Sequence, residues 1–146
     1  MNMVVPQRKF RELVFQMLFS QDLNEGSDFN VITSLLDQLT VTKKTLRQAH
    51  ERMQCVFEKL GDIDQHISRC SRDYDFNRIS RVERNILRLG VFELLYDKDI
   101  PPKVALAESI RLGRKFGTPE GGAFVNAVLD AIYRTSEAEP CLSKTS

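Results

Sequence analysis

The apolar residues of this chain recur every three or four positions through several long segments, and this spacing restricts its fold more than any other feature. Such a period places the apolar side chains on one face of a helix, whereas a half-buried strand needs strict alternation. Glycine and proline fall largely between these segments, where helices begin and end. The sequence therefore predicts an all-α fold, a compact bundle of helices with short connections.

About seven helices are expected, at residues 7–22, 29–39, 43–60, 62–72, 81–96, 101–116 and 119–134. The connection over 73–78 could divide the bundle into two small helical subdomains. A chain of 146 residues has the length of one ordinary domain. We therefore expect one all-helical domain over residues 1–135, followed by a flexible C-terminal tail over 136–146.

Several of these helix boundaries carry capping residues. Ser80 and Glu83 have the spacing of a capping box, in which the hydroxyl accepts a hydrogen bond from a first-turn amide and the carboxylate reaches back. Gly117 stands at a usual helix end, and Thr118 then caps the last helix. The glycines at 121–122 follow, where free N–H groups could bind an RNA phosphate or a carboxylate, although most loops of this composition are only turns.

Positive charge is concentrated in one segment. The net charge is only +1, so any nucleic-acid role depends on local clustering. Residues 78–88 hold four arginines against a single acid, Glu83. Arg81, Arg84 and Arg88 fall within about 60° of one another on a helical wheel. This edge could contact a phosphate backbone, or its arginines could form salt bridges with neighbouring carboxylates.

The expected first helix has a second aromatic face. Its main apolar stripe consists of Phe10, Leu13, Val14, Met17 and Leu18. Phe15 and Phe19 fall roughly opposite this stripe. Arg8 and Glu12 share their face, and Arg11 lies between the two sectors. Aromatic rings beside cations stack on unpaired RNA bases, but a helix packed on both sides would simply bury both rings.

Other classes of protein find little support. The three cysteines, Cys55, Cys70 and Cys141, are odd in number and widely spaced, which favours reduced thiols in a cytoplasmic protein. No signal peptide or long apolar run is present. The sequence has only two histidines and none of the common phosphate-loop, metalloprotease or calcium-loop motifs. We therefore expect no enzymatic activity, no catalytic residue, no cofactor and no bound metal.

Four stretches of the chain resemble the NusB family of transcription antitermination factors. Residues 100–117 (IPPKVALAESI, continuing to KFG) are similar to the family's IP-x-KVAINEA-x-ELAK-x-FG. Residues 124–130 (FVNAVLD) resemble FVNGVLD, and residues 82–94 (VERNILRLGVFEL) resemble E-x-x-ILR-x-A-x-YEL. The segment 8–20 resembles the family's opening, RR-x-ARE to ALY. The resemblance covers residues 8–133 and is most specific in the second half.

This resemblance implies an all-helical RNA-binding protein of two small subdomains. Members bind the boxA element of ribosomal RNA leader and spacer sequences together with a small-subunit ribosomal protein, called NusE in this role. The complex alters RNA polymerase so that it ignores terminators, which promotes rRNA synthesis. The RNA contacts implied here are Arg8, Lys9, Arg11, Phe19, Arg88, Glu120 and Phe124. Glu83 and Arg84 would face the protein partner.

The chain also departs from the family pattern. Phe19 stands where tyrosine is common, and Ala127 replaces the usual glycine. Residues 121–123 (GGA) replace a polar, often basic run. These departures keep open a protein-interaction or homodimerising module with weakened RNA binding. A further alternative is a fragment of an rRNA cytosine methyltransferase, since some of those enzymes carry a similar helical RNA-binding domain.

Overall fold

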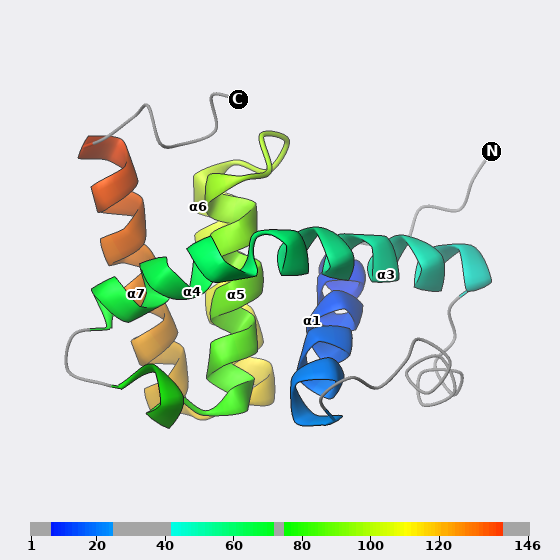
Figure 1. Ribbon diagram of the computed structural model, residues 1–146, viewed down its shortest axis with the longest axis horizontal. Coiled ribbons are helices and arrows are strands. Elements are labelled where there is room, and N and C mark those ends of the chain that lie inside the picture. The colour runs from blue at the N-terminus through cyan, green and yellow to red at the C-terminus, as the bar shows by residue number, and fades with distance from the viewer. Residues whose placement is uncertain (1–6, 25–41, 72–74, 139–146) are drawn as a thin grey trace. The chain divides into compact units, whose positions relative to one another are not determined.

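The computed structural model describes residues 7–24, 42–71 and 75–138. The helices in these ranges are α1 (Gln7–Asn24), α3 (Lys43–Glu58), α4 (Leu60–Cys70), α5 (Arg81–Leu95), α6 (Pro102–Phe116) and α7 (Pro119–Ala138), with a short 3₁₀ turn, η1 (Phe76–Arg78). No strand occurs in the ranges that the structure describes. The all-α prediction is confirmed (Figure 1).

Most helix boundaries lie within two residues of their predicted positions. The helix expected over 29–39 lies outside the described residues. The last helix continues to Ala138, four residues beyond its predicted end at 134, and residues 139–146 of the expected tail also lie outside the described part.

The helices expected over 43–60 and 62–72 place the break between them at Gly61, and that position is wrong. The break between α3 and α4 lies at Lys59, whose φ and ψ are −107° and 10°. The Ile63 N–H then donates to the Lys59 carbonyl at 2.9 Å, which incorporates Gly61 into the first turn of α4. A glycine inside a helix costs only about 1 kcal/mol, so a single one does not have to end it.

The chain divides into two compact units, residues 1–57 and residues 58–146. The division therefore falls where α3 gives way to α4, and not at the predicted connection 73–78. The first unit contains α1 and most of α3, and the second unit contains α4 to α7.

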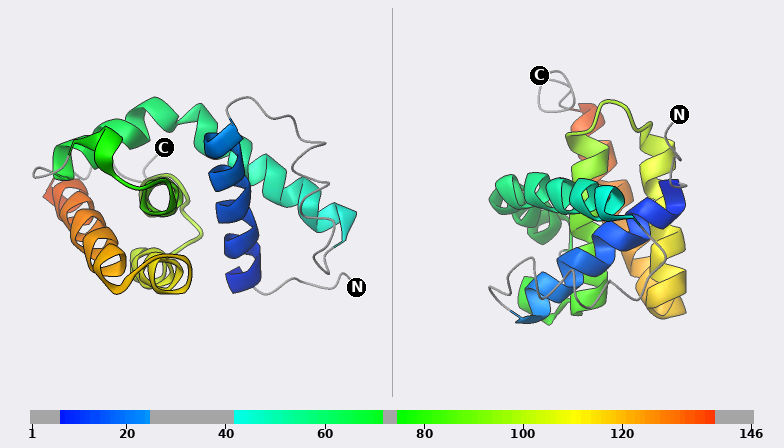
Figure 2. Two further views of the ribbon diagram at one scale, coloured as in Figure 1. Left: turned by 90° about the horizontal axis from the view of Figure 1, so that it is seen from below. Right: turned by 90° about the vertical axis from the view of Figure 1, so that its right-hand side faces the viewer.

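In the second unit α5, α6 and α7 pack against one another in pairs, and α4 packs on α5 and α7. Figures 1 and 2 show α5, α6 and α7 running side by side, with α4 crossing them. Every residue of α5 from Asn85 to Leu95 is buried, so α5 is the central helix of the second unit. A Cβ atom added to Gly90 would meet Ser109 Oγ at 2.5 Å and Leu129 Cδ1 at 3.0 Å, so α6 and α7 lie directly against α5 there.

The predicted caps are present at the ends of these helices. Ser80 Oγ accepts a hydrogen bond from the Glu83 N–H at 3.2 Å, which is the first half of the capping box. Thr118 Oγ1 likewise accepts from the Gly121 N–H at 3.0 Å. Gly117 ends α6 with φ at −116°, outside the left-handed region. It is needed for space instead, because a Cβ there would lie 2.9 Å from the Gly113 carbonyl oxygen.

In the first unit, the main stripe of α1 is buried as predicted, except at half-buried Phe10; the buried members are Leu13, Val14, Met17 and Leu18. On α3 the buried apolar residues are Leu46, Ala49, Met53 and Val56, again at helical spacing. None of the described helices combines the length and apolar character needed to cross a membrane.

Candidate nucleic-acid interface

Four of the expected RNA contacts lie on α1, and the structure exposes them unequally. Arg8 and Lys9 are exposed in the first turn. Arg11 is buried, with an exposed fraction of 6%. Phe19 is half-buried, and its ring lies 6.1 Å from that of Phe15, centroid to centroid. Among these four residues, therefore, the two cations at the start of α1 are exposed and the ring near its end is partly accessible.

Phe15 is buried, in agreement with the alternative interpretation of the second face of α1. Its exposed fraction is 3%, so this ring belongs to the core and cannot stack on a base without rearrangement. The two phenylalanines thus have different environments although they are neighbours on the same helix face. The helical period could identify their common face but not the depth at which each ring lies.

Arg88 on α5 is buried and forms an ion pair with α4. Its Nε and Nη2 donate to Asp64 Oδ1 and Oδ2, each at 2.9 Å, which is the two-pronged geometry that an arginine prefers with a carboxylate. Its Nη1 also donates to Asn85 Oδ1 at 3.4 Å. The side chain is 9% exposed. This arrangement corresponds to the salt-bridge alternative for the arginine edge, and any RNA contact by Arg88 has to share or replace the pair with Asp64.

The ring of Phe76 in η1 lies under two arginines of α5. The guanidinium carbons of Arg84 and Arg88 are 5.5 Å and 5.7 Å from its centroid. Cations at this distance are attracted to the ring face. Neither Phe76 nor Asp64 was predicted from the sequence. Phe76 lies in a 3₁₀ turn outside any long helix, so no periodic signal connected it with the arginines.

Beyond this cluster, Arg78 and Arg81 are exposed. In the part of the chain that the structure describes, neither side chain forms an ion pair or a hydrogen bond. They supply the accessible charge of the arginine-rich segment, whereas Arg84 and Arg88 are drawn toward Phe76.

Glu83 and the start of α7 are brought together. A Cβ on Gly121 would lie 2.6 Å from Glu83 Oε2, so the carboxylate occupies the space that a side chain would need. Negative charge is favourable at a helix N-terminus. Gly121 therefore accommodates Glu83, and Gly122 lies against Arg114 and Gly113 of α6. Binding of an anion by the N–H groups of residues 121–122 stays a prediction. Next to them Glu120 is exposed and Phe124 is half-buried.

The nine predicted contact residues thus fall into two groups. Arg8, Lys9, Arg11 and Phe19 belong to the first unit, and Glu83, Arg84, Arg88, Glu120 and Phe124 belong to the second. Among the described residues, no three His, Cys, Asp or Glu side chains are grouped so that they could hold a metal ion.

Comparisons with known proteins agree with this architecture. The sequence matches the NusB family over residues 8–134. It is 39% identical over 134 residues to the transcription antitermination protein NusB of Desulfosudis oleivorans, an alignment covering 88% of this chain and 85% of the relative. With the corresponding protein of Thermotoga maritima the identity is 38% over 132 residues, covering 90% of this chain and 93% of the relative.

Solved structures show the same similarity. The structure of T. maritima NusB superposes with a TM-score of 0.79 at 38% identity and covers 90% of this chain and 93% of that one. A crystal structure of the antitermination factors NusB and NusE in complex with double-stranded RNA contains a chain that superposes with a TM-score of 0.77 at 27% identity. That match covers 88% of this chain and 96% of the other.

Proposed function

The chain belongs to the NusB family, and we propose from this membership that it is a transcription antitermination factor that binds RNA together with the ribosomal protein NusE. The observation that carries the proposal is the match across residues 8–134 to relatives that bear this name. The similarity to a chain crystallised with NusE and RNA supports both partners.

We propose boxA-type single-stranded RNA of the ribosomal leader and spacer as the ligand. The chain then acts in the cytoplasm by binding and not by catalysis, and its complex joins the transcribing RNA polymerase to promote rRNA synthesis.

On α1, Arg8 and Lys9 are the residues best placed to contact phosphates, because both are exposed at the start of the helix. The half-buried ring of Phe19 offers a face for stacking on an unpaired base. Arg11 is retained as a proposed contact, although its low exposure requires that it act from beneath the surface or move outward.

On the second unit, Glu120 and Phe124 are four residues apart on α7 and so lie on one face of that helix. Phe124 would stack on a base, and Glu120 would accept a hydrogen bond from a base amino group. Arg88 is the last of the proposed RNA contacts. It would have to share or replace its ion pair with Asp64 in order to bind RNA. Glu83 and Arg84 are proposed as contacts to NusE. Both residues are half-buried.

A second candidate is a protein-interaction or homodimerising module with weakened RNA binding. The burial of Arg11 and Arg88 favours it, because two of the expected cations are withdrawn from the surface. This module would bind NusE, or a second copy of itself, without measurable affinity for boxA-type RNA.

The test is the affinity for a short boxA-like RNA, measured with and without NusE at two salt concentrations. We expect sequence-dependent binding that tightens with NusE and weakens with salt. The paired change Arg8→Ala with Lys9→Ala should flatten the dependence of log K on log salt by about 0.7 for each phosphate that the variant no longer neutralises.

Lys43→Ala with Lys44→Ala is the matched control, because these lysines are also adjacent and exposed at the start of a helix of the first unit. The control should leave both affinity and salt dependence unchanged. NusE binding without RNA affinity under any condition would reject the RNA proposal and favour the second candidate.

A further inference from the structure

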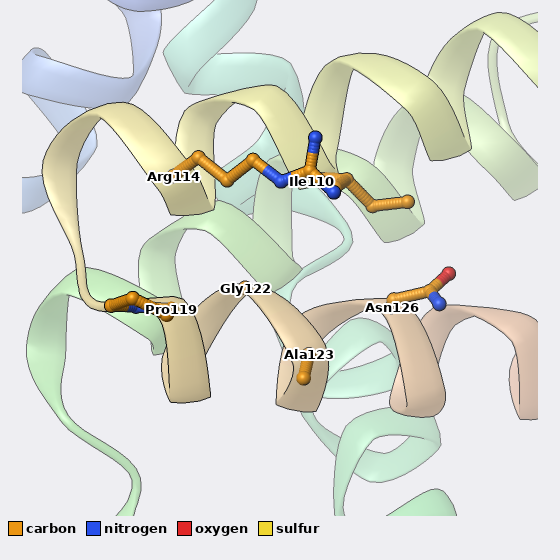
Figure 3. A pocket seen from close by; sticks show the side chains of 6 residues that line it. All are labelled: Ile110, Arg114, Pro119, Gly122, Ala123 and Asn126. Carbon is orange, nitrogen blue, oxygen red and sulfur yellow. The ribbon is translucent and has the colours of Figure 1, made fainter.

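A pocket of about 510 Å³ opens between α6 and α7 of the second unit (Figure 3). Its lining residues are Ile110 and Arg114 of α6 with Pro119, Gly122, Ala123 and Asn126 of α7. None of the residues proposed for RNA or NusE lines this pocket. Its volume lies within the range of about 300–1,000 Å³ that is common for ligand sites.

Two glycines allow α6 and α7 to lie close together at this pocket. A Cβ added to Gly113 would lie 3.1 Å from the Cα atom of Gly122, so the two backbones are in near contact at this point. Gly122 also leaves that part of the lining without a side chain. Ile110, Pro119 and Ala123 then contribute only apolar surface.

Two polar side chains at this pocket lack a partner among the residues that the structure describes. Neither the Arg114 guanidinium nor the Asn126 carboxamide forms a hydrogen bond or an ion pair within those ranges, and both residues are exposed. Figure 3 shows the Arg114 side chain extending along α6 in the direction of Ile110. Other arginines of these helices are paired: Arg111 with Glu108 and Arg134 with Asp130, each at 3.0 Å.

We propose that this pocket binds a segment of a protein partner that carries a carboxylate next to an aliphatic side chain. The planar fork of Arg114 matches a carboxylate in two parallel hydrogen bonds. The amide group of Asn126 can donate a further bond. Ile110, Pro119 and Ala123 form an apolar surface for the adjoining aliphatic side chain.

The lining argues for a peptide rather than RNA. A nucleic-acid backbone is usually met by several cations, and only Arg114 among the lining residues is charged. Unpaired bases are usually held by stacking on aromatic rings, and no aromatic residue contributes to this lining. The inference goes beyond the proposed function, since none of the residues proposed for RNA or NusE lines this pocket.

The probe is the acetylated, amidated peptide Leu-Glu-Leu-Glu, titrated into the full chain labelled with ¹⁵N. We expect saturable amide shifts centred on Arg114, Gly122 and Asn126. Arg114→Gln should weaken the affinity at least about tenfold, which corresponds to about 1.4 kcal/mol. The uncharged peptide Leu-Gln-Leu-Gln should bind the unaltered chain as weakly as Leu-Glu-Leu-Glu binds the Arg114→Gln variant.

Lys115→Gln is the control, because Lys115 is the next exposed cation on α6 and its ammonium lies over the ring of Phe116, 5.6 Å from the centroid. This change should leave the affinity within about twofold. The proposal is overturned if the shifts do not saturate, or if they map away from these residues. It is also overturned if Arg114→Gln binds as well as the unaltered chain, or if single-stranded RNA displaces the peptide. The saturation, the mapping of the shifts and the Arg114→Gln comparison do not depend on whether the chain binds boxA RNA or NusE, so a failure of this proposal is distinguishable from a failure of the proposed function.

Discussion

The guanidinium of Arg88 is enclosed by Asp64, Asn85 and the ring of Phe76. A buried arginine is costly unless its donors are satisfied, and here a carboxylate from another helix supplies the main acceptor. The pair therefore ties α4 to α5 inside the second unit. Arg88, which the family resemblance implies as an RNA contact, is therefore paired with another residue of the fold.

Removing Arg88 should consequently destabilise the fold. Arg88→Ala leaves the carboxylate of Asp64 unpaired, and we expect the free energy of unfolding to fall by about 2–4 kcal/mol in urea denaturation. Arg81→Ala is the control, since Arg81 is exposed on the same helix and should change the free energy by less than about 0.5 kcal/mol. Equal effects of the two substitutions would show that the ion pair does not stabilise the domain.

The histidines should make the stability depend on pH. Burial lowers the pKa of His66 below 6.5, and Arg69 lowers it further while Asp62 raises it; burial also lowers the pKa of His50. The unfolded chain therefore takes up protons more readily than the folded chain as the pH falls through this region, and stability is lost on acidification.

We expect Tm to decrease as the pH is lowered from about 7.5 to about 5.5, and to decrease less in the His66→Gln variant. Adding His50→Gln should flatten the dependence further, because the pKa of His50 is lowered in the same direction. A decline of unchanged size in the double variant would assign the effect to other groups.

At the scale of the helices, two glycines have opposite roles. Gly90 on α5 faces Ser109 and Leu129, whereas nothing lies within 4 Å of the position that a Cβ on Gly61 of α4 would take. Gly90→Ala should lower the free energy of unfolding by about 1–3 kcal/mol through overpacking. Gly61→Ala should raise it by about 0.5–1 kcal/mol, because alanine favours a helix. Urea denaturation of both variants checks this. A Gly90→Ala protein as stable as the unaltered chain would mean that α6 and α7 do not pack tightly against α5 at this position.

The same helices show what local sequence could predict. The starts of α5 and α7 were predictable because Ser80 and Thr118 are capping residues whose hydrogen bonds depend only on neighbouring residues. The break at Lys59 was not predictable in this way. The sequence pattern places the end of a helix at Gly61, although a single glycine is tolerated inside one. Apolar residues predominate between Ile86 and Leu95, which favours the burial that α5 shows there.

At the scale of the whole molecule, the candidate interface was only partly accessible to sequence reasoning. The period of α1 predicted a second face but could not distinguish buried Phe15 from half-buried Phe19. The pairing of Arg88 with Asp64 joins residues 24 positions apart, which no local pattern encodes. The family resemblance supplied the function, because its motifs extend over most of the chain. Which residues contact RNA stays a prediction for mutagenesis.

The most direct test of the proposed function is readthrough of a terminator in a reconstituted transcription reaction. The template would carry a boxA-like sequence upstream of the terminator, and the reaction would contain a bacterial RNA polymerase, NusE and the other antitermination factors, with or without this chain. We predict that the chain raises readthrough on this template and not on one with a scrambled boxA. Equal readthrough with and without the chain, under conditions in which a known NusB protein is active, would contradict the account.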